Sequence, residues 1–352
     1  MAGRGMSGRS LRRRRVYVAE MEPIRVGLVA DPASPTEVAR RMTDLVPPAG
    51  ADVQVWDIEI MSEPFTLGSE DVDVALARLR AHAEQRAWDL VIGVTELPLR
   101  DVDGRYLLAA IDTRRQSAVL SLPALGGFRV GTRARHAVRG LVSGMAEPMM
   151  AEEQRLPLPG VSARGRVLLG MVLANRPWLL AAGLKSALVA ALATGAVATI
   201  EPTVWLLASS LSGWRLAVAT IVSIAIVIAW IVIDGELWDR PEDDSAQARE
   251  RSRLYNTSTL LTLTVGVVIC YLGLYVVNLA WALFVLDPAV MGDSLGASFD
   301  YGDLFVLTWF VASVATIGGA LGTGLESDDA IRAAAYSKRE EDRRARLAGD
   351  ST

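Results

Sequence analysis

The sequence is poor in the side chains that build disulfides, metal clusters and acid–base centres. Its 352 residues include one cysteine, Cys270, and two histidines, His82 and His136. One thiol excludes an intrachain disulfide and a zinc site built on several thiolates, and a zinc site needs three or four ligands. We therefore expect no metal, and no sequence motif indicates a cofactor. The net charge of −4 lacks the basic excess typical of nucleic-acid binding, so we predict no nucleic-acid partner.

Long apolar stretches are abundant, by contrast, in the second half of the chain. Each of four stretches is close to the ~20 residues that a helix needs to cross a bilayer. They cover about residues 178–200, 214–233, 257–279 and 304–325. We therefore predict an integral membrane protein whose all-α domain consists of four transmembrane helices in contact with the lipid bilayer.

The loops between these stretches carry their basic residues on one side only. Residues 201–213 and 280–303 contain no Lys or Arg, whereas the segments before the first stretch, between the second and third, and after the fourth are rich in Arg. Positively charged loops stay in the cytoplasm. The pattern predicts a multi-pass protein of the plasma (inner) membrane with both termini in the cytoplasm.

The first half of the chain has the pattern of an α/β domain. Within residues 24–155, apolar β-rich runs alternate with helix-period segments, which indicates a mostly parallel sheet with a flavodoxin-like outline. Strands are expected at 24–30, 53–60, 89–95, 106–111 and 117–122, and helices from residue 35, at 70–87 and at about 133–149. No apolar signal segment precedes this domain, so we expect it in the cytoplasm.

Three segments lie outside these two domains. Residues 1–23 read as a disordered basic leader, with Met21 as an alternative start and an anionic-lipid-binding arm as the other interpretation. Residues 156–177 form a juxtamembrane linker that holds either an interfacial helix or a plain connector. Residues 326–352 are a charged cytoplasmic tail, either a solvated helix or a contact for a protein partner or anionic lipid.

Candidate functional residues follow the predicted strands, because open α/β sheets bind ligands outside the carboxyl ends of their strands. Carboxylates there could act as acid and base or bind a metal. The catalytic candidates are Asp31, Glu96 and Asp112, and the ligand-binding candidates are Thr95, Thr113, Arg114, Gly126 and Gly127. The same residue types are common in helix caps and turns, so catalysis and a purely structural role both remain open.

One stretch resembles a known enzyme core. Residues 91–97 (Val-Ile-Gly-Val-Thr-Glu-Leu) and 119–122 (Val-Leu-Ser-Leu), followed by a helix, are similar to the core of archaemetzincin-like metalloproteases. That family carries H-E-x-x-H on the helix, whereas this chain has Arg139, Gly140 and Ser143 at the matching positions. The resemblance implies a degenerate, non-catalytic relative.

The layout as a whole resembles uncharacterised actinobacterial membrane proteins that join an N-terminal cytoplasmic α/β domain to four helices. The resemblance rests on an opening Val-Gly-Leu-Val-Ala-Asp-Pro, a later Ser-Leu-Pro-Ala-Leu-Gly, and a strong preference for Arg over Lys, typical of a high-GC genome. It implies an architecture but no mechanism.

The apolar stretches contain little that a transport pathway would need. Lys185 is the one charged residue well inside a stretch, whereas Arg215 and Asp234 lie at the ends of the second stretch. Lys185 either pairs with an acid or extends to the cytoplasmic interface. Gly318 and Gly322 form a G-x-x-x-G that favours close helix packing, within the chain or in a homo-oligomer. We therefore favour a membrane-anchored interaction or regulatory module, with a membrane-tethered enzyme and a small transporter as alternatives.

Overall fold

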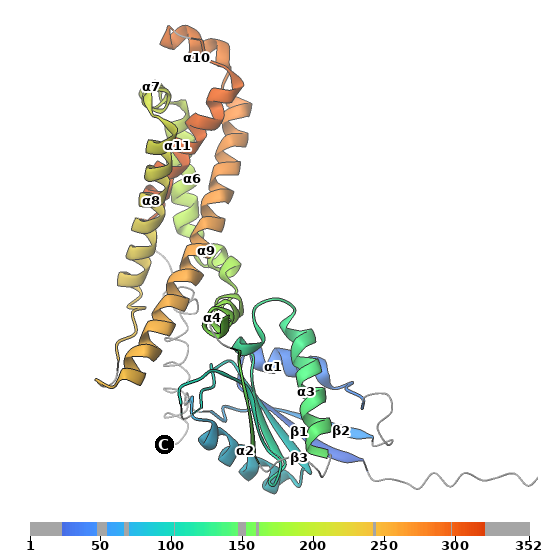
Figure 1. The fold of residues 1–352 in the computed structure, drawn as a ribbon. Coiled ribbons are helices and arrows are strands. Elements are labelled where there is room, and N and C mark those ends of the chain that lie inside the picture. Colours follow the sequence, from blue (N-terminus) through green and yellow to red (C-terminus); the bar gives the residue numbers. More distant parts are fainter. Residues whose placement is uncertain are drawn as a thin grey trace, which may run out of the picture.

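The computed structural model describes residues 23–47, 55–66, 70–101, 103–146, 153–159, 162–241, 244–296 and 298–320. An α/β domain is followed by a set of long helices that rise from one end of it (Figure 1). The predicted fold class is confirmed: a mixed, mostly parallel sheet precedes a helical region.

Six strands form one sheet in the order β2-β1-β3-β5-β4-β6. The strands are β1 (Ile24–Ala30), β2 (Trp56–Ser62), β3 (Leu90–Thr95), β4 (Leu107–Asp112), β5 (Ser117–Ser121) and β6 (Glu153–Pro157). Strands β2, β1, β3 and β5 are parallel, whereas β4 runs antiparallel to both β5 and β6. The edge strand β6 was not predicted, because Glu-Gln-Arg-Leu-Pro has no run of apolar or β-branched residues.

Helices cover both faces of this sheet. They are α1 (Ser34–Ala39), η1 (Arg40–Met42), α2 (Val72–Arg86), η2 (Pro123–Leu125) and α3 (Val130–Ala146). One core joins β1, β3 and β5 to α1 and α3, and the core on the opposite face joins the same strands to α2. The domain therefore has three layers, as the alternation of strand and helix patterns predicts.

The helical region contains more elements than the four predicted spans. They are α4 (Ser162–Ala174), η3 (Pro177–Leu179), α5 (Leu180–Gly183), α6 (Lys185–Ile200), α7 (Pro202–Ser210), α8 (Gly213–Asp234), α9 (Ala246–Val285), α10 (Pro288–Leu295) and α11 (Tyr301–Ala320). By length and composition, α8, α9 and α11 are each able to cross a membrane. A fourth span exists if Ser162–Gly183 and Lys185–Ile200, which meet at a bend of 56°, count as one.

The predicted spans differ from the observed helices in three places. The first predicted span, 178–200, is broken at Leu184, whose side chain is buried in the apolar cluster at this end of the bundle. The third is a single helix of 40 residues, because the polar segment before residue 257 is also helical. The fourth begins at Tyr301, and its predicted end at residue 325 lies outside the described residues.

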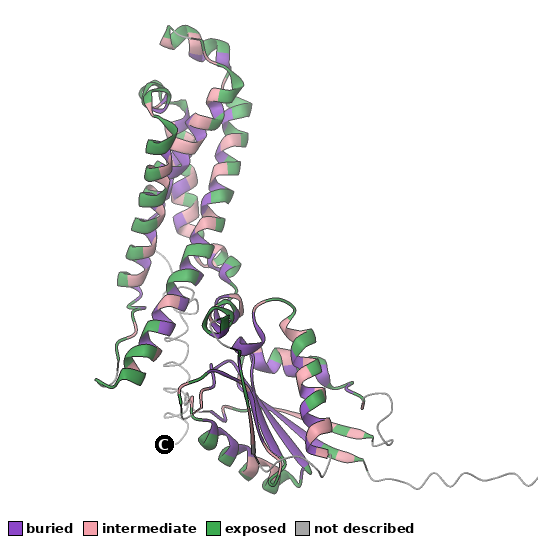
Figure 2. Cartoon of the chain, viewed as in Figure 1, coloured by how far each residue is buried: buried purple, intermediate pink, exposed green. Residues whose placement is uncertain are grey.

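The helices that could span a membrane expose apolar side chains outward. Large apolar residues on α8, α9 and α11 are exposed, including Ile221, Ile226, Ile233, Leu272, Val276, Val277, Phe305 and Val314. Buried positions instead line the inner faces of these helices (Figure 2). An outer surface this apolar fits a lipid environment rather than water.

Small residues allow the bundle to pack closely. A Cβ on Gly319 of α11 would lie 2.9 Å from the carbonyl oxygen of Ala187 on α6, and a Cβ on Gly318 would lie 3.1 Å from Thr194 Oγ1. Gly318 thus packs within the chain, so this part of the predicted homo-oligomer face is already in use; Gly322 lies outside the described residues. Lys185, the first residue of α6, is exposed.

Candidate functional site

The carboxyl ends of β1 and β3 lie side by side at the point where the sheet changes its winding direction. Strand β1 is paired with β2 on one side and with β3 on the other, so the connections leave in opposite directions. Asp31 directly follows β1, and Thr95 and Glu96 stand at the end of β3. Such a switch point is where doubly wound sheets bind ligands.

Asp31 and Thr95 are joined by a buried hydrogen bond. The hydroxyl of Thr95 donates to Asp31 Oδ2 at 2.6 Å, and the hydroxyl of Thr66 donates to the same oxygen at 3.1 Å. Thr95 Oγ1 also accepts the backbone N–H of Leu97 at 3.0 Å. All of these threonine and aspartate side chains are fully buried. Asp31 is thus held by the ends of two strands and by the segment after β2.

Glu96 contributes to a cavity of about 140 Å³ above this edge. The cavity is enclosed by α1, the start of α3, the end of α4 and η3, and its walls are mainly apolar. Its lining residues include Ser34, Glu96, Gly127, Leu173, Arg176 and Trp178. Arg176 at its rim forms an ion pair with Glu37 of α1. The cavity therefore joins the sheet edge to the chain segment that enters the helical bundle.

Gly126 and Gly127 allow close packing of helix α4 against the domain. A Cβ on Gly127 would lie 2.1 Å from Leu173 Cδ1, so a side chain there would displace α4. Gly126 ends η2 with φ +83°, a left-handed conformation that favours glycine. Arg133 and Arg166 both donate to the carbonyl oxygen of Leu125 in this turn. Packing is the role that the contacts support for this pair.

The remaining candidates lie at the opposite end of the strands, where the parallel strand β5 begins. Because β4 is antiparallel to β5, its last residue Asp112 pairs with Ser117, the first residue of β5. Thr113 and Arg114 follow in the same turn. Asp112 forms an ion pair with Arg80 of α2 and accepts the backbone N–H of Arg115. The structure therefore separates these residues from Asp31 and Glu96. Their predicted placement was wrong because it assumed that the fourth strand is parallel to the others.

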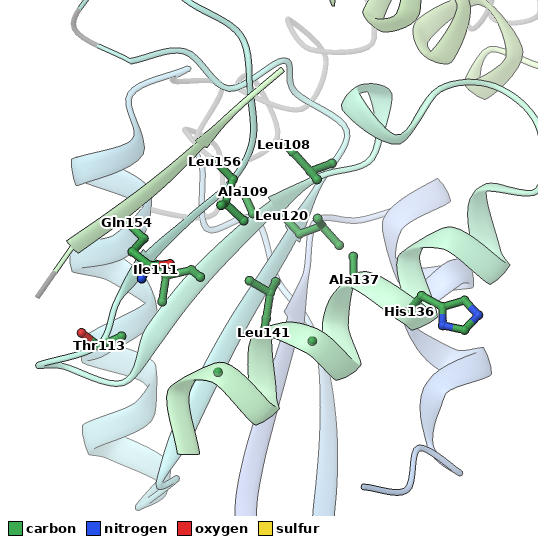
Figure 3. Close-up of a pocket in the computed structure, with 12 residues that line it drawn as sticks. Leu108, Ala109, Ile111, Thr113, Leu120, His136, Ala137, Leu141, Gln154 and Leu156 are labelled. Atoms are coloured by element: carbon green, nitrogen blue, oxygen red, sulfur yellow. The ribbon is translucent and has the colours of Figure 1, made fainter. Parts of the chain in front are cut away.

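An apolar groove of about 260 Å³ lies between α3 and strands β4, β5 and β6 (Figure 3). Leu108, Leu120, Leu141 and Leu156 line it, and Thr113 stands at one end. The ring of His136 points away from these leucines (Figure 3). Across the described residues, no group of three or more His, Cys, Asp or Glu side chains is placed to hold a metal ion.

A charged network, which the sequence did not reveal, joins the α/β domain to α9. Arg100 lies 3.3 Å from Glu70 Oε2 and 3.5 Å from Glu250 Oε1 of α9. It also donates to the Tyr106 hydroxyl at 2.9 Å and stacks over that ring at 4.6 Å. The hydroxyl of Tyr255 on α9 donates to Glu70 at 2.6 Å. We call Glu70, Arg100, Tyr106, Glu250 and Tyr255 the joint.

The joint is partly shielded from water, and this burial shifts the pKa of two of its side chains. Burial raises the pKa of the Glu70 carboxyl above its ordinary value of 4.5, against the lowering effects of the Tyr255 hydrogen bond and the Arg100 charge. Burial also raises the pKa of Tyr106. Beside the joint, an apolar cluster packs α4 and α9 against the domain through residues such as Leu97, Val167, Met171 and Leu254. The domain is thus attached to the bundle by two kinds of contact.

Hydroxyl groups occupy the interior of the helical bundle. The hydroxyl oxygens of Thr220, Tyr271 and Ser313 form a triangle in which each pair of oxygens is 3.1 Å apart. Trp309 Nε1 donates to Thr220 Oγ1 at 2.7 Å. A small cavity of about 40 Å³ adjoins Tyr271. Within residues 178–320, as far as they are described, no Asp, Glu, Lys or Arg side chain is buried. The hydrogen bonds among Thr220, Tyr271, Ser313 and Trp309 fit helix association through polar side chains.

Comparisons of the chain with protein-family models, with curated proteins and with solved structures find no match.

Proposed function

We propose that this chain is a membrane-anchored cytoplasmic module of the interaction or regulatory type. In this proposal α6, α8, α9 and α11 cross the membrane, both termini lie in the cytoplasm, and the α/β domain binds a small ligand or a protein. The positions of the basic residues support the orientation. The exposed apolar surface of α8, α9 and α11 supports the membrane anchor.

The observation that carries the regulatory part is the position of the cavity beside Glu96. Its walls come from the carboxyl edge of the sheet and also from α4 and η3, which lead directly into the first apolar helix. A ligand in this cavity would contact both the domain and the segment that enters the bundle. Binding would then shift the equilibrium between arrangements of the two parts.

The structure gives less support to the two alternative functions. An enzyme that uses all three carboxylates would need Asp112 near Asp31 and Glu96. Asp112 instead lies at the opposite end of the strands, beside the first residue of β5. A transporter normally has ionisable residues along an internal pathway. The cavity inside the bundle is lined mainly by apolar side chains and has a volume of about 40 Å³, which favours an anchor.

Cysteine labelling of the full chain in cells tests the orientation. In a Cys270→Ser background, Ser210→Cys places a thiol at the end of α7 and Ser245→Cys places one just before α9. We expect a membrane-impermeant maleimide to label the first variant in intact cells and the second only after the cells are opened. Labelling of the Ser245→Cys variant from outside would overturn the proposed orientation.

Native mass spectrometry of the full chain in nanodiscs tests the cavity. After incubation with a cell extract, we expect the wild-type chain to retain a small molecule that Glu96→Gln retains less. Glu84→Gln is the matched control: it removes the same charge as Glu96→Gln, at an exposed position on α2. Equal retention by both variants would contradict a role for the cavity.

A further inference from the structure

Among the described residues, three arginines that line one cavity beside the joint have no carboxylate partner. Arg80, Arg100, Arg105, Arg135 and Arg155 are each in an ion pair with Asp or Glu. Within the part of the chain that the structure describes, Arg164, Arg249 and Arg253 form no ion pair. We call these three the arginine cluster.

The arginine cluster surrounds one cavity, although its members are far apart in the sequence. Arg164 lies near the start of α4, whereas Arg249 and Arg253 lie one turn apart on α9. The cavity has a volume of about 310 Å³, and its remaining lining residues are Ala246 and Glu250. The carboxylate of Glu250 already faces Arg100 of the joint at 3.5 Å. Three arginines and one acidic residue therefore line the cavity, and the carboxylate of that residue also faces Arg100. The Arg249 guanidinium donates to the backbone carbonyl oxygen of Asp244, which leaves its charge without a carboxylate partner among the described residues.

We propose that the arginine cluster binds a phosphate group. Like charges gathered at one cavity without matching carboxylates repel each other, and an anion between them removes that repulsion. A guanidinium group donates two parallel hydrogen bonds to a phosphate, and several arginines together bind a doubly charged anion well. The volume of the cavity suits a phosphate with part of the molecule that carries it.

Two sources of the phosphate fit the position of the cluster. Leu260 is the first large apolar residue of α9 that is exposed, and it lies about 10 Å along the helix from Arg253 at 1.5 Å per residue. The polar headgroup layer is about 5–7 Å thick on each side of the hydrocarbon, so the Arg253 side chain reaches it. A lipid headgroup and a soluble phosphate compound both meet this requirement. The lipid source rests on the proposed membrane orientation; the site itself does not.

Arginine footprinting of the full chain distinguishes the two sources. Phenylglyoxal modifies accessible arginines, and peptide mass spectrometry reports the rate at each position. The chain is placed in nanodiscs of phosphatidylcholine alone, in the same nanodiscs with inorganic pyrophosphate, and in nanodiscs with phosphatidylglycerol mixed in. Arg78 and Arg115, which are exposed and do not line the cavity, are the internal controls.

We expect the arginine cluster to be modified at least about threefold more slowly when the phosphate is present. Protection by pyrophosphate in phosphatidylcholine supports a soluble ligand, and protection by phosphatidylglycerol alone supports a lipid headgroup. Unchanged rates at Arg164, Arg249 and Arg253 in both arms would overturn the proposal. An equal slowing at Arg78 and Arg115 would also overturn it, because the effect would then be general to the surface.

A pair of variants provides a second readout. Arg249→Gln with Arg253→Gln removes two guanidiniums, and Arg78→Gln with Arg115→Gln removes the same charge elsewhere. We expect the first variant to bind the protecting phosphate at least about tenfold more weakly, since one charge-assisted hydrogen bond is worth about that factor. The control variant keeps its affinity. Thermal unfolding of both variants checks that they fold, and equal affinities would contradict the site independently of the proposed orientation.

Discussion

The hydroxyl of Tyr255 donates a 2.6 Å hydrogen bond to Glu70, although the two residues are 185 positions apart. Tyr255 lies on α9, whereas Glu70 lies just before α2 in the α/β domain. The contact thus connects a helix that could span a membrane with the domain beside it. Arg100 strengthens the connection because it faces both Glu70 and Glu250. The joint gives a direct path between the ligand-binding domain that we propose and the bundle.

Removing the Tyr255 hydroxyl should loosen the start of α9. We expect Tyr255→Phe to cost about 1–3 kcal/mol locally, because the partly buried Glu70 carboxylate loses its donor. Hydrogen exchange of residues 246–256 should become about tenfold faster or more in this variant. Tyr301→Phe is the control, since Tyr301 is exposed at the start of α11. Unchanged exchange in Tyr255→Phe would show that the joint does not hold the helix.

The joint should weaken as the pH rises. Burial raises the pKa of Glu70 above 4.5 in the folded chain, so the protonated form is the one that the fold favours. This stabilising contribution is complete below pH 4.5, and it is lost as the pH rises through the raised pKa. Glu70→Gln keeps an uncharged side chain at every pH. We expect the stability of the wild-type chain relative to Glu70→Gln to fall over this window, measured by thermal unfolding in detergent. A difference that does not change with pH would contradict the raised pKa.

The hydrogen bond between Thr95 and Asp31 should matter for the stability of the α/β domain. Thr95→Val keeps the shape of the side chain but removes the donor to the buried Asp31 carboxyl group, so we expect a loss of about 1–3 kcal/mol in its free energy of unfolding. Thr95→Ser retains the hydroxyl and should lose less. Chemical denaturation followed by tryptophan fluorescence measures both. If the two variants are equally stable, the hydroxyl does not contribute.

Two glycines should respond in opposite ways to alanine. Gly319→Ala places a Cβ 2.9 Å from the Ala187 carbonyl oxygen, so α6 and α11 must separate, at a cost of about 1–3 kcal/mol. Gly140 is inside α3, and a Cβ there meets nothing within 4 Å. Gly140→Ala should therefore stabilise the chain by about 0.5–1 kcal/mol, since alanine favours helix. Thermal unfolding of the two variants in the same detergent is the measurement. Destabilisation by both would contradict the packing argument.

Local patterns in the sequence predicted most of the secondary structure. The strand at Ile24–Ala30 has the predicted bounds, and β3 and β5 differ by a single residue at one end. These strands are buried apolar runs, which are a strong local signal. Strand β6 lacks that signal, because it is an edge strand and only Leu156 in it is a large apolar residue. The bend before Lys185 was also missed, since the apolar composition continues through it.

The candidate site residues also differ in whether local sequence patterns could predict their positions. Asp31, Thr95 and Glu96 were found because they follow parallel strands, and the structure brings them to one edge. Asp112 was predicted to lie with them because the residues of β4 do not indicate whether the strand is parallel or antiparallel to its neighbours. The choice between parallel and antiparallel pairing depends on the short turn from Asp112 to Ser117 and on the neighbouring strands.

The sequence by itself determined the fold class, the apolar stretches from which four spans were predicted, and the one-sided distribution of basic loops. These properties follow from composition and periodicity, which act over a few helical turns. Only the tertiary structure decided which polar residues meet. Glu70 with Tyr255, and Arg164 with Arg249 and Arg253, come from distant segments. Their contacts depend on how α4 and α9 pack against the domain, and no local pattern contains that information.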